Sequence, residues 1–286
     1  MAHPPTFLAA YLSRVGLAAS LAAAPPSAEL LGALMAAQSR AIPFENLDVV
    51  LRRPVSLHAG DVAAKLLGAA PRRGGYCFEH NGLLLRALLA LGFRGEPLLC
   101  RVRWGKAPDE ATPFTHVALR VGFAGTPTDY LVDVGFAGTN SVAPLPLGGA
   151  AAALPEGTFR ALDGATAPGY TTLQLDVRGE WRDLYMWRTG EAASRGDLAQ
   201  ANLWSYAAAE ARFTNELFVT RVVDGARHFL INDVHRVRPA LDAAAAATTE
   251  EVVRDAAHLD RLLSGVFGLD APGGVAEAWE RAYRRR

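Results

Sequence analysis

One cysteine stands in an unusual setting, in the stretch PRRGGYCFEHNGLLL at positions 71–85. A leucine-rich run follows and stops before Gly92, which predicts a buried helix that begins near Cys77. At a helix N-terminus, unpaired backbone N–H groups and the positive end of the helix dipole stabilise an anion and therefore favour a thiolate. Most free cysteines are small buried apolar side chains, but that interpretation leaves the preceding arginines and glycines without a purpose. We predict that Cys77 is a nucleophile.

A cysteine nucleophile needs a base, and the base needs a group that orients it. Residues 113–121 alternate between apolar and polar and predict a strand that carries His116, and residues 129–136 predict a second strand that carries Asp133. The Gly- and Pro-containing segment 122–128 can close a hairpin, which would place the two side chains side by side. A carboxylate in the apolar sequence LVDV needs a partner, and the imidazole is the obvious candidate.

Other polar residues near the cysteine compete for roles in the site. His80 follows Cys77 by three residues, shares a similar helix face and is the rival base. Only Glu79 lies close to it in sequence as an orienting group, so we favour His116. The arginine pair 72–73 is interpreted as a structural partner of nearby acids in preference to a phosphate-binding group.

Four motifs together resemble the arylamine N-acetyltransferase family. They are RRGGYCFEHN at 72–81, THV at 115–117, VDVGF at 132–136 and IPFENL at 42–47. The resemblance implies a Cys77–His116–Asp133 triad in a papain-like cysteine catalytic core. It also implies acetyl-CoA as the acyl-donor substrate, with no permanently bound cofactor, and an arylamine or hydrazine as the acceptor. The family usually has glycine where this chain has Ala137, which bears on the preferred acyl chain.

Contacts for both substrates are expected around these motifs. For the donor we assign Trp104, Thr115, Phe136, Gly138 and Thr139. For the acceptor we assign Phe44, Val102, Phe114 and Phe213. The glycine-containing loop 135–140 has backbone N–H groups that can hold a pyrophosphate, although two glycines in a loop are a weak signal. The aromatic residues are equally consistent with core packing, and Phe44 by itself favours the core.

The elements that must position these residues fall into three units. Residues 1–95 read as mostly helical, with Ser27 capping one helix, and carry the nucleophile. Residues 96–190 contain short strands separated by Gly and Pro, which predict a small antiparallel barrel carrying the histidine and the aspartate. Residues 191–286 predict an interdomain helix and an α/β lid. The expected fold is therefore α+β, with an N-terminal helical bundle, a central antiparallel β-barrel and a C-terminal lid.

Finer features of the last two units are also predicted. The Ala-, Gly- and Pro-rich residues 148–168 are expected to be loop. Asp197 is expected to cap the interdomain helix, and Thr249 the final helix. Asp224-Gly225, between two apolar runs, is a strong hairpin signal.

Composition restricts the possible partners and the compartment. The 286 residues carry 29 basic and 29 acidic side chains, which favours neither nucleic acid nor an anionic membrane. No apolar run approaches ~18 residues and the N-terminus lacks a secretory pattern, so neither a transmembrane helix nor a secretory signal is expected. We expect a cytoplasmic protein that is a monomer or a homodimer. Two cysteines and scattered histidines predict neither a disulfide framework nor a metal site, and Cys100 reads as a core residue.

The predicted reaction is acyl transfer in two half-reactions. The thiolate of Cys77 attacks the thioester and releases coenzyme A, and an arylamine, hydrazine or N-hydroxyarylamine then attacks the acyl-enzyme, with His116 accepting its proton. Such a reaction suits xenobiotic metabolism. A triad alone does not identify the acceptor. Two alternatives therefore stay open: a family-related amide synthase that closes a macrolactam from a carrier-bound acyl thioester, and a triad cysteine hydrolase or transglutaminase-like enzyme.

Overall fold

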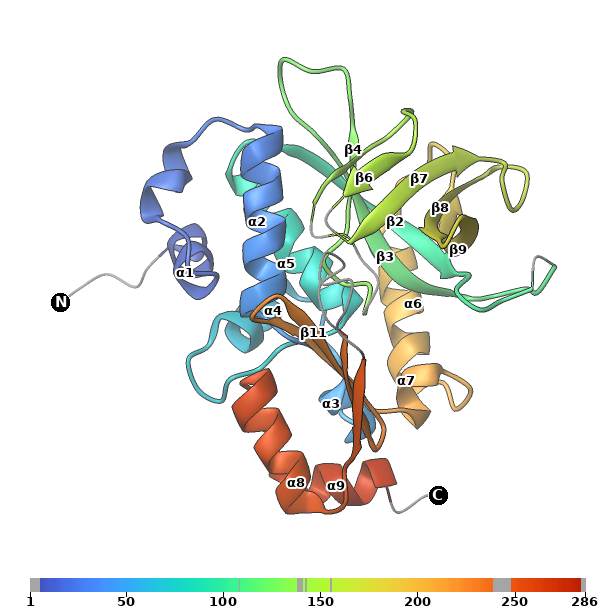
Figure 1. Ribbon diagram of the computed structural model, residues 1–286. Helices are drawn as coiled ribbons and strands as arrows, with labels where there is room; N and C mark the ends of the chain where they lie inside the picture. The colour runs from blue at the N-terminus through green and yellow to red at the C-terminus, as the bar shows by residue number, and fades with distance from the viewer. Residues whose placement is uncertain are drawn as a thin grey trace.

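The computed structural model describes residues 6–107, 109–137, 141, 143–154, 156–238 and 248–283 (Figure 1). The N-terminal part is a helical bundle. Its helices are α1 (Phe7–Arg14), η1 (Ala19–Ala23), α2 (Ala28–Ala41), α3 (Leu47–Val50), α4 (Ala59–Leu67) and α5 (Cys77–Ala90). The predicted cap of α2 is present, because Leu30 N donates to Ser27 Oγ at 3.2 Å.

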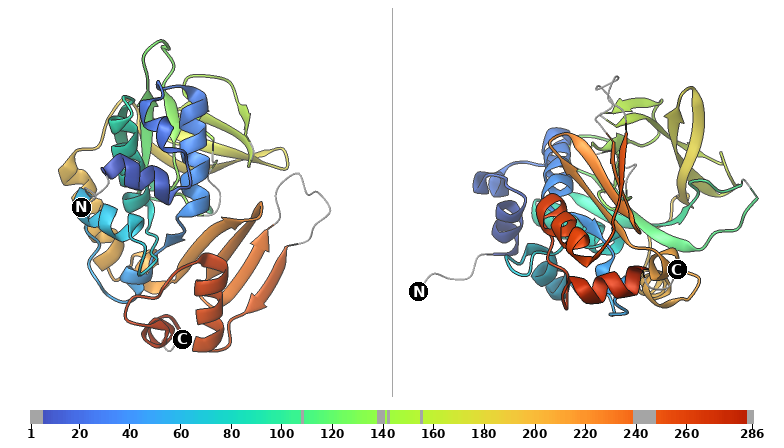
Figure 2. Two further views of the ribbon diagram at one scale, coloured as in Figure 1. Left: turned by 90° about the vertical axis from the view of Figure 1, so that its left-hand side faces the viewer. Right: turned by 60° about the horizontal axis from the view of Figure 1, so that its bottom comes forward.

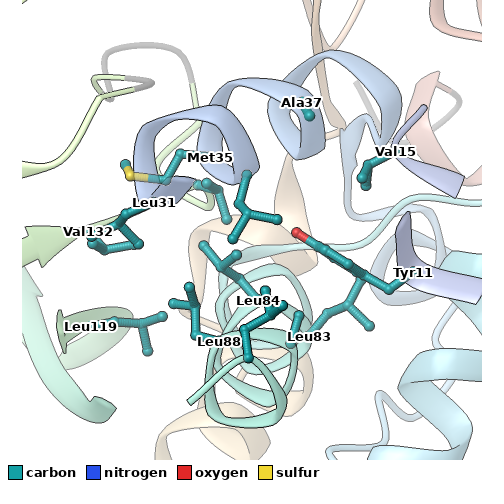
Figure 3. Packing of buried hydrophobic residues seen from close by; sticks show 14 of the residues in the cluster. Tyr11, Val15, Leu31, Met35, Ala37, Leu83, Leu84, Leu88, Leu119 and Val132 are labelled. Carbon is teal, nitrogen blue, oxygen red and sulfur yellow. The ribbon is translucent and has the colours of Figure 1, made fainter. Parts of the chain in front are cut away.

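Helix α5 is held along its length by an apolar core. Leu84 and Leu88 of α5 lie close to Leu31 of α2 and to Leu119 and Val132, on the neighbouring strands β3 (Phe114–Gly122) and β4 (Tyr130–Val132) (Figure 3). All five side chains are at most 1% exposed. Full burial of one leucine contributes about 1.5–3 kcal/mol, so this packing fixes α5, and with it the cysteine at its first residue, against the strands.

The central part is a barrel-like antiparallel sheet of eight strands in the order β5-β4-β3-β2-β9-β8-β7-β6 (Figure 1). Besides β3 and β4, its strands are β2 (Arg94–Val102), β5 (Leu145–Pro146), β6 (Ala152–Leu154), β7 (Gly157–Asp163), β8 (Tyr170–Val177) and β9 (Glu180–Arg188). The expected antiparallel barrel is confirmed. The helical bundle covers one side of the barrel. Leu119 of β3 pairs with Val132 of β4, and both side chains pack in the same apolar cluster as α5.

The loop prediction for residues 148–168 is wrong. Strands β6 and β7 lie within this segment, and β7 pairs with β8 from Phe159 to Asp163. Alanine and glycine have a weak intrinsic preference for strands, so the local composition did not reveal β6 and β7. Pairing with β8 and burial of Phe159, which is 1% exposed, overcome that preference.

The C-terminal part is a second antiparallel sheet, in the order β1-β10-β11-β12-β13. Its strands are β1 (Phe44–Glu45), β10 (Phe218–Val223), β11 (Ala226–Ile231), β12 (Val234–Arg238) and β13 (Thr249–Val252). Helix α8 (Ala256–Arg261), the π-helical turn η2 (Leu262–Phe267) and α9 (Val275–Tyr283) cover one face of this sheet (Figure 2). The predicted hairpin turn is present, and Asp224 and Gly225 have φ of +49° and +78°, as a type I′ turn requires.

Two predicted helix starts are wrong. The interdomain helix α6 (Arg195–Ala207), which precedes the short α7 (Arg212–Asn215), is capped by Ser194. Asp197 N donates to Ser194 Oγ, while Asp197 Oδ2 accepts from Ser194 N, so the aspartate is the second half of a capping box. Thr249 begins β13, which pairs with β12, and α8 begins after Asp255, whose side chain accepts from His258 N at 2.7 Å.

The barrel sheet extends from Arg94 at the start of β2 to Arg188 at the end of β9, and the division into units 1–95, 96–190 and 191–286 remains our proposal. Strand β1 crosses this division, since it belongs to the first unit in sequence and pairs with β10 of the third. In the described part of the chain, no helix has the length and apolar character needed to cross a membrane.

Candidate active site

Cys77 is the first residue of α5, as predicted, and is 2% exposed. Its Sγ lies 3.7 Å from Thr115 O on β3. Glu79 stabilises the helix start, because its Oε2 accepts a hydrogen bond from Tyr76 N at 3.1 Å. The glycines that precede the helix are required by close packing, since a Cβ at Gly74 would lie 2.0 Å from the carbonyl oxygen of residue 43.

Buried ion pairs hold the segment that leads into the helix. Arg73 Nη2 lies 2.7 Å from Glu45 Oε1 and 2.8 Å from Asp48 Oδ2. Lys65 Nζ lies 2.7 Å from both Asp48 Oδ2 and Glu79 Oε1. Removal of one member of such a buried group leaves an uncompensated charge, which costs about 3–5 kcal/mol. The structural interpretation of the arginine pair is confirmed for Arg73.

The structure brings His116 and Asp133 together. His116 Nε2 lies 2.7 Å from Asp133 Oδ2, and both side chains are buried. His116 lies on β3 and Asp133 follows β4, so the predicted hairpin is what places them side by side. The side chain of Cys77 lies near enough to the imidazole to contribute to raising the pKa of His116. Because Nε2 faces the carboxylate, Nδ1 is the ring nitrogen left for the sulfur.

Asn81 positions the carboxylate, and the sequence motifs did not reveal this. Asp133 Oδ1 accepts from Asn81 Nδ2 at 2.9 Å and from Gly135 N at 2.8 Å. Asn81 Oδ1 in turn accepts from Val134 N at 3.1 Å. The available signal was its spacing, since Asn81 lies four residues after Cys77 and therefore on the same helix face. Gly135 permits this approach, because a Cβ there would lie 2.7 Å from Cys77 Cα.

The electrostatic environment favours a protonated His116 and an ionised Asp133 at neutral pH. Burial alone would lower the pKa of His116, but the charge of Asp133, its hydrogen bond and the Cys77 side chain outweigh burial and raise the pKa to about 10. Burial would raise the pKa of Asp133, but the charge of His116 and hydrogen bonds from His116, Asn81 and Gly135 hold it below its usual value. An imidazolium that is paired with a carboxylate and lies beside a cysteine is the arrangement that activates cysteine nucleophiles.

The rival base His80 has a structural role. Its ring is 1% exposed, and its Nε2 lies 3.0 Å from Pro43 O, to which the neutral imidazole donates. Gln38 Nε2 lies 3.5 Å from Nδ1 and donates to His80 O at 2.9 Å. Burial lowers the pKa of His80 to about 4, and the hydrogen bond to Pro43 opposes this only in part. Its neutral ring links α5 to α2 and to the turn before β1.

This buried neutral histidine predicts acid-sensitive stability. The folded pKa of about 4 lies below the unfolded value of ~6.5, so the unfolded chain binds more protons between these pH values and the free energy of unfolding falls as pH is lowered through them. The loss approaches roughly 3 kcal/mol at the acid end of this window. Urea denaturation at pH 7.5, 6 and 5 measures it for the native chain and for His80→Gln, which keeps a donor but does not titrate.

The His80→Gln variant should lose less stability between pH 7.5 and 5 than the native chain. The matched control is His58→Gln, because the His58 side chain is 78% exposed, and its pH dependence should follow that of the native chain. Identical pH dependence in all three proteins would contradict the assignment of His80 as the buried neutral group.

Cys77 and His116 line a cleft of about 710 Å³ between the barrel and the C-terminal sheet, a volume suited to a sizeable ligand. Six of the predicted contact residues also line it: Phe44, Val102, Trp104, Thr115, Phe136 and Phe213. Phe114 is not among the lining residues, and its ring lies 4.0 Å from the guanidinium carbon of Arg101. Gly138 and Thr139 lie outside the described residues. Among the residues that are described, no three metal-ligating side chains are arranged to hold a metal ion.

Comparison with known proteins gives the family. A family model described as N-acetyltransferase matches residues 27–273. The arylamine N-acetyltransferase of Mycolicibacterium smegmatis is 38% identical over 272 residues, which cover 92% of each chain. An arylamine N-acetyltransferase / N-hydroxyarylamine O-acetyltransferase of Salmonella typhimurium is 35% identical over 259 residues, or 88% of this chain and 87% of its own.

A solved structure extends the similarity to the fold. The structure of Mycobacterium marinum arylamine N-acetyltransferase in complex with CoA superposes with a TM-score of 0.86 at 32% identity, and covers 97% of this chain and 98% of that chain. The fold and these matches define a cysteine-containing acyltransferase. The chain belongs to the arylamine N-acetyltransferase family, which confirms the resemblance seen in its four motifs.

Proposed function

We propose that the chain transfers an acetyl group from acetyl-CoA to the nitrogen of an arylamine, hydrazine or N-hydroxyarylamine, through a thioester on Cys77. The observation that carries this proposal is the buried, hydrogen-bonded pair of His116 and Asp133 beside Cys77, a cysteine that begins a helix and lines the cleft. The names of the relatives support the acyl donor and the acceptor class.

The first half-reaction loads the enzyme. The thiolate of Cys77 attacks the carbonyl carbon of the acetyl thioester, the C–S bond to coenzyme A breaks, and the departing sulfur takes the proton that His116 carries. The backbone N–H of Cys77, at the start of α5, is the donor that we assign to the developing oxyanion. Exchange of one thioester for another is nearly isoenergetic, so loading is reversible.

The second half-reaction delivers the acetyl group. The acceptor nitrogen attacks the thioester carbon, His116 accepts a proton from that nitrogen, and Cys77 leaves as a thiolate. An amide is more stable than a thioester, so this step is downhill. Phe213 lies 5.8 Å from Phe44 and 5.5 Å from Phe218 between ring centroids, and this aromatic wall suits a flat apolar acceptor.

The alternative activities gain no support from the comparisons. The curated relatives described above are named as acetyltransferases, and none of those names describes an amide synthase, a hydrolase or a transglutaminase. A cytoplasmic setting is proposed because both cysteines are free and the nucleophile must stay reduced. A monomer or homodimer remains our proposal for the oligomeric state.

Acetyl loading in the absence of an acceptor tests the proposal directly. Incubation with acetyl-CoA alone should place one acetyl group on the Cys77 peptide, as seen by mass spectrometry, because the thioester forms before the acceptor binds. Steady-state rates with donor and acceptor both varied should give parallel double-reciprocal lines. Intersecting lines without an adduct would indicate direct transfer in a ternary complex and would rule out the covalent mechanism.

A further inference from the structure

The loop that joins β2 to β3, here called the wall loop, forms one wall of the cleft. Its described residues are 103–107 and 109–113, and all of them except Arg103 and Thr112 are exposed. Neither of these two is an apolar side chain, so no apolar core holds the described part of the loop. The ion pair of Lys106 with Glu110 joins side chains that are 43% and 42% exposed, and such a pair contributes little. Six residues of the wall loop nevertheless line the same cleft as Cys77: Trp104, Lys106, Glu110, Ala111, Thr112 and Pro113.

Arg103 supplies the contacts that hold the wall loop. The residue is 2% exposed, and its guanidinium donates from Nη1 to Glu110 O and from Nη2 to Ala107 O. Its own backbone is fixed to the barrel, because Arg103 N donates to Leu184 O of β9 at 2.8 Å. A guanidinium presents its donors as a rigid fork. Two hydrogen bonds from one fork therefore fix the turn that Glu110 N closes by donating to Ala107 O at 3.1 Å.

The burial of this guanidinium couples the arginine to the conformation of the loop. A charged group that is removed from water must keep its hydrogen-bond partners, because an unsatisfied buried donor is costly. Movement of the wall loop would take two carbonyl oxygens away from Arg103. A second arginine supports the far end of the loop, because Arg101 Nη1 donates to Thr112 O. Main-chain hydrogen bonds from β2 therefore build this wall before any substrate binds.

Other contacts hold the catalytic group. The wall loop leads directly into β3, where Thr115 O lies 3.7 Å from Cys77 Sγ. His116 is fixed by the pairing of β3 with β2 and by the carboxylate of Asp133. The hydrogen bonds that Arg103 donates to the loop take no part in these contacts. Loss of the guanidinium should therefore disturb the wall of the cleft and leave the reactivity of Cys77 as it is.

We propose that Arg103 is a positioning residue, which fixes the wall loop in the conformation that the acyl donor meets and so determines how tightly the donor binds. A wall that is ordered in advance removes the entropy cost of ordering it during binding. This inference rests on the proposed function and deepens it. Donor binding depends on the wall loop and Arg103, whereas the reactivity of Cys77 depends on His116 and Asp133.

The test measures the loading half-reaction of Arg103→Ala as the concentration of acetyl-CoA is varied. The concentration that gives half of the maximal loading rate should rise at least about tenfold, because the wall loop loses two charge-assisted hydrogen bonds and becomes mobile. The maximal loading rate should change less than about threefold. The pH dependence of iodoacetamide alkylation at Cys77 should match that of the native chain. Thiol release reports loading, and circular dichroism checks the fold.

Chemical rescue and two further variants separate positioning from a general loss of structure. Guanidinium chloride at a low, non-denaturing concentration supplies the missing fork, so it should restore donor binding in Arg103→Ala and leave the native chain unchanged. Arg103→Lys keeps the charge without the fork and should raise the half-saturating concentration less than Arg103→Ala does. It also provides the test should Arg103→Ala fail to fold. The control is Arg120→Ala, which removes a partly buried arginine of the same barrel that pairs with Glu96, and it should load normally.

Three outcomes would overturn the inference. A native half-saturating concentration in the folded variants of Arg103 would show that the wall loop does not need its guanidinium. A loss that guanidinium does not restore would mean that the substitution disturbs the barrel as a whole. An altered pH profile of alkylation would mean that Arg103 acts on the catalytic group. Failure of the proposed function has a separate signature, because the native chain would then not load Cys77 from acetyl-CoA.

Discussion

The Cys77→Ser variant is expected to lose acetyl transfer by at least ~10³-fold, because the unit of Cys77, His116 and Asp133 works only with an ionised nucleophile. A serine hydroxyl stays neutral at physiological pH and supplies no negative charge opposite His116. The thiolate that attacks the donor is then missing, although the helix start and the cleft are unchanged. Thiol release from acetyl-CoA in the presence of an arylamine measures the rate, and mass spectrometry should find no acetyl group on residue 77.

Cys100→Ser is the stringent control for this loss. Cys100 lies on β2 directly opposite His116, so it also lies near the imidazole. It is fully buried, its Sγ donates to Leu98 O at 3.3 Å, and burial raises its pKa well above the usual value, so it stays a thiol. Most activity should remain, and equimolar iodoacetamide should modify Cys77 first. Equal loss in the two variants would refute the assignment of one nucleophile.

Local patterns predicted the elements whose signals are contained in a few neighbouring residues. The Asp224-Gly225 turn and the Ser27 cap depend on backbone dihedrals and hydrogen bonds within four residues, and both are present. The predicted caps at Asp197 and Thr249 were wrong because neither outcome is decided by the capping residue alone. Several nearby residues can cap a helix, and pairing with β12 made the segment at Thr249 a strand.

Features that depend on distant partners were beyond local patterns. A two-residue strand such as β1 has no periodicity of its own, and it forms because Phe44 and Glu45 pair with Thr220 and Val219. Strand β7 likewise depends on its pairing with β8. The spacing of short strands along residues 96–190 predicted the barrel, whereas the composition of residues 148–168 indicated loop for part of it.

In the site too, features set by neighbouring residues were predictable and features that depend on distant partners were not. The pairing of His116 with Asp133 was predictable, because a short hairpin joins the strands that carry them and a carboxylate in an apolar strand needs a partner. The role of Asn81 required knowledge of where α5 packs, since its amide contacts Asp133 across 52 positions of sequence.

Asp133→Asn is expected to lower acetyl transfer by at least ~10²-fold while the fold survives. An amide fits the same space, and its oxygen can keep the hydrogen bonds that Asn81 Nδ2 and Gly135 N donate to Oδ1 at 2.9 and 2.8 Å. Its NH₂ group then faces His116 Nε2, which must become an acceptor. The ring proton moves to Nδ1, the nitrogen that faces Cys77, and the imidazole is held in the wrong tautomer.

The charge at position 133 also matters for the pKa of His116. Among the effects that raise this pKa to about 10, the charge of Asp133 is the largest, and burial alone would lower it. The variant should therefore have a His116 pKa well below that of the native chain, and less imidazolium to stabilise the thiolate at neutral pH. In a serine-protease triad the equivalent change lowers turnover ~10⁴-fold, and a smaller effect is expected for a thiol, which depends less on its base.

The measurement is the rate of Cys77 acetylation across pH 6 to 10 in a variant whose fold is verified by circular dichroism. The native rate should persist toward the pH of about 10 at which His116 loses its proton, and the variant should lose its rate at lower pH. Asp129→Asn, a half-exposed carboxylate just before β4, should leave both the rate and the profile unchanged. A near-native rate with an unchanged pH profile in Asp133→Asn would make Asp133 structural and reduce the catalytic group to a Cys77–His116 dyad.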